Sequence, residues 1–175
     1  MDLKSIQKPL KEKYRNDPNS SRITLRAHSA QTDTPVACAV EVGQKFLDAQ
    51  AHHGVGGPGT AACSGDLLLG ALAACAQLTC QLVATAMGIP VDRIAVDVEG
   101  KMDLRGTLGV AKEVPVGFQE IVATFDVQAP NATAEQLAAL REKTEQYCVV
   151  MRTLAQPPEI KTSWIGTDQA LSSEI

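Results

Sequence analysis

The feature that most constrains this chain is a run of 25 uncharged residues, from Leu67 through Val91. Such a run is long enough to cross a lipid bilayer. However, Gln77 and Gln81 lie four residues apart and so share one helical face, and no Trp or Tyr flanks the run closely. We therefore expect a helix buried in the core of a soluble protein.

Local signals mark both ends of this helix. Ser64 is a suitable N-cap, and Asp66 in the first turn complements the helix dipole. At the other end, Gly88 and Pro90 are typical of a helix that stops. The sequence thus predicts a helix from about residue 65 to 87.

The length of this helix also predicts a homodimer. At about 1.5 Å per residue it spans roughly 35 Å, close to the diameter of about 40 Å expected for a compact chain of this size. It is apolar on nearly all sides, apart from a stripe of small or polar residues. One further helix and a few strands are too little to enclose it, so a second copy is expected to cover it.

The other elements predict an α+β fold rather than a doubly wound sheet, because the strands are grouped. A second helix is expected from Thr133, with Gln136 in capping-box spacing, and its apolar face continues to Leu154 before Pro157 and Pro158 end it. Strands are expected at residues 22–28, 36–42, 44–48, 93–104, 118–127 and 159–164. We interpret residues 1–20 as an N-terminal arm and residues 21–175 as one domain.

Composition excludes some partners. Twenty acidic and 16 basic residues give a net charge of −4, and the chain has only six aromatic residues, so we expect no nucleic-acid partner. The N-terminus is too polar for a secretory signal, which predicts a cytoplasmic protein, and we expect no membrane partner. The cations Lys4, Lys8, Lys11 and Arg15 could share one helical face, but we favour a solvated arm docked on the body or a partner subunit.

No motif predicts a cofactor or a metal. Gly54–Gly59 matches G-x-G-x-x-G, but a polar segment precedes it and the helix begins several residues later, so we interpret it as a flexible connection. The three histidines and five cysteines match no zinc spacing.

The thiols are the remaining candidates for chemistry. Cys75 and Cys148 each fall on an apolar helical face, so they either meet in one core or are unrelated small core residues. Cys63 lies next to the expected N-cap, where the helix dipole favours a thiolate, so local physics ranks it as the more reactive thiol. Cys75 lies too far along the helix to gain from that field and would need a cation, such as an arginine, folded against it.

Four segments carry a resemblance to a known family: 64–75 (Ser-Gly-Asp-Leu-Leu-Leu-Gly-Ala-Leu-Ala-Ala-Cys), 84–90, 96–100 and 145–149. The chain resembles the OsmC/Ohr family of osmotically inducible and organic hydroperoxide resistance proteins, and Cys63–Asp66 looks like a particular OsmC-like subgroup. The resemblance implies two long central helices wrapped by antiparallel sheets in an intertwined homodimer. It also implies that Cys75 attacks an organic hydroperoxide and that Cys148 resolves the product.

The chain departs from the better-known members at several positions. Those proteins have a Pro-Glu pair where this chain has Ser64 and Gly65, so that Asp66 is the only acid available, and they have proline where this chain has Val149. The arginine of their first hairpin is not recognisable, and the candidates for it are Arg22, Arg26 and Arg105.

These observations predict a thiol-dependent peroxidase with Cys75, Cys148, Cys63 and Asp66 as its site residues. Its expected substrate is a small apolar hydroperoxide, and an external dithiol is expected to reduce it again. The alternative is a non-catalytic OsmC-like protein that binds an apolar small molecule or senses redox state through Cys63.

Overall fold

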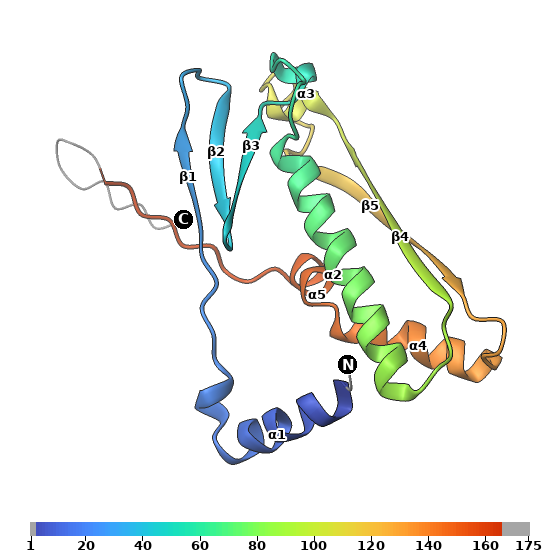
Figure 1. Ribbon diagram of the computed structural model, residues 1–175. Helices are drawn as coiled ribbons and strands as arrows, with labels where there is room; N and C mark the ends of the chain where they lie inside the picture. Colours follow the sequence, from blue (N-terminus) through green and yellow to red (C-terminus); the bar gives the residue numbers. More distant parts are fainter. Residues whose placement is uncertain (1–2, 166–175) are drawn as a thin grey trace.

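The computed structural model describes residues 3–165, which form an α+β fold, as predicted. Three strands make one antiparallel sheet in the order β1-β2-β3, and two longer strands make a separate hairpin, β4-β5, that runs along the long helix α2 (Figure 1). The elements are α1 (Leu3–Asn16), η1 (Pro18–Ser21), β1 (Ala27–Gln31), β2 (Ala37–Val42), β3 (Lys45–Gln50), η2 (His53–Val55), α2 (Ser64–Met87), β4 (Arg93–Met102), α3 (Leu104–Thr107), β5 (Phe118–Gln128), α4 (Ala134–Tyr147) and α5 (Val149–Ala155).

Helix α2 has nearly the predicted bounds, but its N-cap differs. The N-cap is Cys63 rather than Ser64, and the Cys63 N–H donates to Oδ2 of Asp66 at 2.8 Å. Asp66 thus satisfies an amide that would otherwise lack a partner at the helix start. At the C-terminus, Gly88 adopts a left-handed φ of 69°, which a glycine accepts without steric cost.

The core lies between α2, the β4-β5 hairpin and α4. Strand β4 pairs with β5 from Arg93↔Gln128 to Met102↔Phe118, with one irregularity beside Met102. Two clusters of buried residues follow one face of α2: Cys80, Ala84, Ile89 and Leu140 form one, and Leu72, Ala76 and Cys148 form the other. The predicted buried helix is therefore buried on one side only, because Leu68, Leu78 and Leu82 on its other sides are exposed.

The first strand begins later than predicted. Its pairing with β2 starts at Ala27↔Val42, so residues 22–26 precede the sheet as extended chain. Ile23 and Leu25, whose alternation suggested a strand, are exposed. The expected loop after β4 begins with the short helix α3 (Leu104–Thr107).

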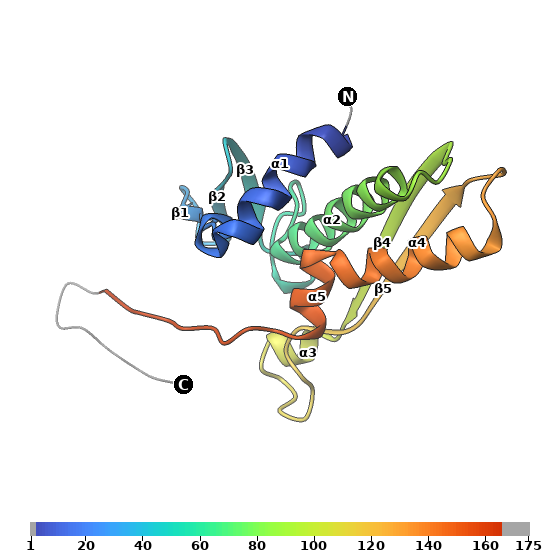
Figure 2. The same cartoon turned by 90° about the horizontal axis from the view of Figure 1, so that it is seen from below.

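The C-terminal part differs more from the prediction. The second helix is not continuous: α4 ends at Tyr147 and α5 starts at Val149. The strand expected at residues 159–164 is absent, because residues 157–163 form no regular element and Trp164 makes only an isolated bridge. This segment projects from the body (Figure 2), and Ile160 and Trp164 are exposed. A strand needs a neighbouring backbone for its N–H and C=O groups, and no described strand pairs with residues 157–163.

The single domain predicted for residues 21–175 extends past the described part of the chain, since residues 166–175 lie outside it.

Candidate functional site

The structure brings Cys75 and Cys148 together in one cluster. Cys75 lies near the middle of α2 and is half-buried, whereas Cys148 is fully buried between α4 and α5. Both pack with Leu72 and Ala76, and both are free thiols. The two cysteines therefore meet in one core, which was one of the two interpretations that the sequence left open.

Cys148 occupies the point where the second helix breaks. It is the C-cap of α4 and the N-cap of α5, with a ψ of 106° that takes it out of the helical region. Its own N–H still donates to the Thr144 carbonyl at 3.0 Å. The next amides start a new helix and therefore have no partner within it. The break thus presents free N–H groups beside the two thiols.

These groups set the ionisation of Cys75. Burial raises the pKa of the thiol, but the backbone N–H of Val150 and the thiol of Cys148 both hydrogen-bond to its sulfur. The Thr79 hydroxyl and the Val149 N–H add to them, and together they hold the pKa of Cys75 below its ordinary value. No arginine is among the groups that shift the pKa of Cys75 in the described chain; the groups that lower it are Cys148, Thr79 and the backbone at the start of α5.

The pKa of Cys148 shifts in the opposite direction. Burial raises its pKa, and the nearby Cys75 raises it further, because the Cys148 thiol donates a hydrogen bond that it can give only while protonated. The backbone N–H of Met151 opposes this and does not reverse it. The pKa values of the two neighbouring thiols are therefore shifted apart, lowered at Cys75 and raised at Cys148.

Cys63 and Asp66 lie at the N-terminus of α2, away from Cys75. Twelve residues separate Cys63 from Cys75, which corresponds to about 18 Å along a helix axis. Hydrogen bonds from the Cys63 N–H and the Cys63 thiol lower the pKa of Asp66, and the charge of His52 contributes less. Both residues therefore act as a helix cap in this structure, and neither joins the Cys75–Cys148 cluster.

None of the three candidate arginines contacts Cys75 among the described residues. The guanidinium of Arg105 donates to Oδ2 of Asp103 at 2.6 Å, and this pair raises the pKa of Arg105 and lowers that of Asp103. Arg22 and Arg26 lie in the exposed chain before β1. The sequence could nominate these residues, but only the fold shows where they lie.

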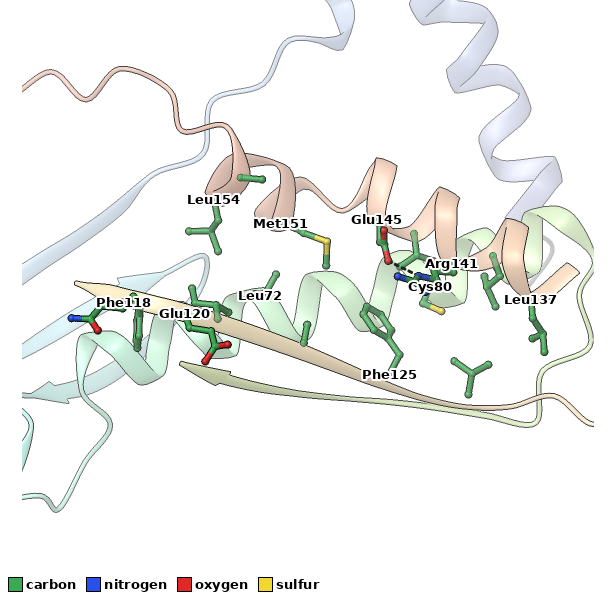
Figure 3. A pocket seen from close by; sticks show the side chains of 17 residues that line it. Leu72, Cys80, Phe118, Glu120, Phe125, Leu137, Arg141, Glu145, Met151 and Leu154 are labelled. Carbon is green, nitrogen blue, oxygen red and sulfur yellow. Dashed lines mark hydrogen bonds and ion pairs between the residues drawn. The ribbon is translucent and has the colours of Figure 1, made fainter. Parts of the chain in front are cut away.

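A cavity of about 800 Å³ lies beside the thiol cluster and was not predicted. Figure 3 shows it between β5, α2 and the α4–α5 pair, with Phe125 pointing into it and the Arg141–Glu145 ion pair (2.9 Å) on α4. Its walls are mainly apolar, and Leu72 and Met151 belong both to it and to the surroundings of the thiols. The alternating apolar residues of β5 (Ile121, Ala123, Phe125 and Val127) were the signal available in the sequence.

The cavity also contains a buried polar atom. Thr144 is 2% exposed, and its hydroxyl lies beside the Cys80 thiol, where it partly offsets the rise that burial causes in the pKa of Cys80. Among residues 3–165, no group of three His, Cys, Asp or Glu side chains is placed to hold a metal.

Comparisons with known proteins agree on the fold. Residues 57–163 match the profile of the OsmC family, described as OsmC-like protein. The structure is similar to an OsmC-like protein from Mycoplasma pneumoniae, with 18% identity, 77% of this chain and 89% of that chain covered, and a TM-score of 0.63. It is also similar to organic hydroperoxide resistance proteins from Elizabethkingia anophelis (18% identity, 78% and 91% covered, TM-score 0.59) and Legionella pneumophila (17% identity, 78% and 92% covered, TM-score 0.58). No curated protein matches the chain.

Proposed function

Because the chain belongs to the OsmC-like protein family, as its motifs predicted, we propose that it is a thiol-dependent peroxidase that reduces organic hydroperoxides in oxidative-stress defence. Two of the similar structures are organic hydroperoxide resistance proteins, which supports a role in redox defence. The observation that carries the proposal is the opposite shift of the two pKa values, lowered at Cys75 and raised at Cys148, within one packed cluster.

In the proposed reaction, the Cys75 thiolate attacks the outer oxygen of the hydroperoxide. The O–O bond breaks, the sulfur gains an oxygen and becomes a sulfenic acid, and the leaving alkoxide takes a proton to become an alcohol. The Cys148 thiol then attacks the Cys75 sulfur, which releases water and forms a disulfide. An external dithiol reduces that disulfide and is itself oxidised, which restores both thiols.

The site favours the first step at Cys75 for a physical reason. A thiolate is the nucleophile in this chemistry, and a lowered pKa keeps more of Cys75 in that form at neutral pH. Cys148 remains protonated until the sulfenic acid forms, so it does not compete for the peroxide. The adjacent apolar cavity supports an alkyl or fatty hydroperoxide as the substrate rather than hydrogen peroxide.

We also propose that the protein is a cytoplasmic homodimer. The described chain leaves Leu68, Leu78 and Leu82 of α2 exposed, as well as Ile160 and Trp164 in the projecting C-terminal segment. Exposed apolar side chains along a long central helix are typical of a surface that another protein copy covers. Sedimentation equilibrium tests this: a folded species of 18.5 kDa at micromolar concentration would disprove the dimer.

The cavity favours a second candidate function, the binding of an apolar small molecule without turnover. Its volume suits a ligand of drug size, and its mainly apolar walls suit an apolar one. Redox sensing through Cys63 has less support, because Cys63 is separated from the thiol pair and serves as the cap of α2.

Cys75→Ser and Cys63→Ser distinguish these functions. In a cumene hydroperoxide consumption assay with an excess of dithiothreitol, the proposal requires that Cys75→Ser abolish turnover and that Cys63→Ser retain it. Cys63→Ser is a matched control, since both variants remove one half-buried thiol of the same helix region. Equal turnover in wild type and Cys75→Ser would rule out the peroxidase mechanism and favour the binding function.

A further inference from the structure

The N-terminal helix α1 has an apolar stripe that the described chain covers only at its start, where Leu3 is half-buried and α1 contacts α2, whereas Ile6, Leu10 and Tyr14 stay exposed. Leu3, Ile6, Leu10 and Tyr14 recur at intervals of three and four residues, so they share one side of the helix. No residue of α1 is buried, and Ile6, Leu10 and Tyr14 are 47%, 42% and 40% exposed. Figures 1 and 2 show α1 at the periphery of the molecule, away from the β4-β5 hairpin.

The cations of α1 lie along the two edges of its apolar stripe. Lys4, Lys8, Lys11 and Arg15 fall within an arc of about 60° at 100° per residue, beyond one edge of the apolar stripe. Lys13 lies beyond the other edge, next to Ile6. Long cationic side chains at both edges of an apolar stripe can lie along the apolar surface and keep their charges in a polar layer.

The charge of α1 opposes that of the rest of the protein. Five cations and one acid, Glu12, give the helix a net charge of +4 in a chain whose total is −4, so the remainder carries −8. An anionic surface therefore attracts α1 and repels the body. Residues 17–26, which include η1 and are mostly exposed, connect α1 to β1.

We propose that α1 lies on the surface of an anionic lipid bilayer, with Leu3, Ile6, Leu10 and Tyr14 among the acyl chains and the cations at the headgroups. A helix with low overall hydrophobicity, an apolar stripe and a basic polar face is typical of this binding mode. Tyr14 adds an aromatic ring with a polar hydroxyl, which suits the headgroup boundary. The inference goes beyond the proposed function and replaces the sequence-based expectation of no membrane partner with peripheral binding.

The other occupant to consider is a second copy of this chain. Its acidic body would also attract α1, but docking on protein would depend on protein concentration and not on lipid charge. Binding of α1 to a bilayer depends on the charge of the lipid headgroups, and it weakens when added salt screens that charge. These different dependences separate the two occupants in one experiment.

The test is co-sedimentation of the full chain with vesicles of phosphatidylcholine alone, and of phosphatidylcholine with phosphatidylglycerol. We expect binding to the second kind only, and its loss as sodium chloride is raised. Each cation near an anionic surface changes the partition coefficient of a protein onto the membrane about fivefold. The double variant Lys8→Gln with Lys11→Gln should therefore bind the anionic vesicles about 25-fold more weakly than the wild type. Leu10→Gln should weaken binding as well, by removing a large part of the apolar stripe.

The matched control is Lys112→Gln with Lys161→Gln, which changes the net charge equally at exposed positions outside α1. It should bind vesicles like the wild type. Equal binding to both kinds of vesicle, or equal loss in the control and α1 variants, would overturn the proposal. So would Leu10→Gln lowering the mass at sedimentation equilibrium while leaving vesicle binding unchanged, since a second copy would then cover the stripe.

Discussion

Replacing Cys148 by Ser should stop oxidation at the sulfenic acid of Cys75, because no other cysteine of α2 can take its place. A disulfide requires two Cα atoms within about 7 Å. Cys63 lies about 18 Å from Cys75 along the helix axis. Cys80 is five residues away, which gives a rise of about 7.5 Å and a rotation of about 140°, or a Cα separation of about 9 Å.

The assay treats reduced wild type and Cys148→Ser with one equivalent of cumene hydroperoxide, followed by dimedone and peptide mass mapping. Wild type should form the Cys75–Cys148 disulfide and carry no dimedone. Cys148→Ser should carry dimedone at Cys75, and Cys63→Ser should behave like the wild type. An intramolecular disulfide between Cys75 and either Cys63 or Cys80 in Cys148→Ser would refute the geometry on which this reasoning rests.

Three further predictions test the ionisation and the packing. Alkylation of Cys75 by iodoacetamide should persist to lower pH than alkylation of Cys148, because the pKa is lowered at Cys75 and raised at Cys148. Mass spectrometry measures the pH midpoint of alkylation at each cysteine, and equal midpoints would contradict this prediction. Asp66→Ala should lower the free energy of unfolding by about 1 kcal/mol in urea titrations near neutral pH. That difference should vanish once the pH falls below the lowered pKa of Asp66, because the wild-type carboxyl is then neutral in the folded and unfolded states, and a constant difference would exclude the cap. Leu140→Ala, at a 2% exposed core position, should cost about 3 kcal/mol in the same titration, and a change below about 1 kcal/mol would mean that the cluster it joins is not packed as described.

Short-range signals explain why the elements of this fold could be predicted. The run of uncharged residues, Asp66 at its start and Gly88 at its end specify α2 through capping and backbone preferences, which act within a few residues. The Thr133–Gln136 capping box likewise places the start of α4, where the Thr133 hydroxyl accepts from the Gln136 N–H at 3.2 Å. The error of one residue at Cys63 shows that several neighbouring residues can serve as caps.

The sequence also nominated Cys75 and Cys148, through their positions on apolar helical faces and through the family resemblance. It ranked Cys63 higher on local physics, because the only helix start visible nearby was that of α2. It could not reveal the break at Cys148, since neither glycine nor proline marks that position. The break depends on how α4 and α5 pack against α2, which is a property of residues distant along the chain.

By itself, then, the sequence determined the α+β class and the approximate bounds of the long helix, and it left open whether Cys75 and Cys148 meet. Only the tertiary structure decided the directions in which the pKa values of the two thiols shift, because the backbone donors to Cys75 come from Val149 and Val150, more than seventy residues away. It also decided that residues 157–163 form no strand, because a strand exists only where another backbone lies beside it to complete its hydrogen bonds. Helix ends are set by neighbours in sequence, whereas strands and ionised thiols depend on neighbours in space.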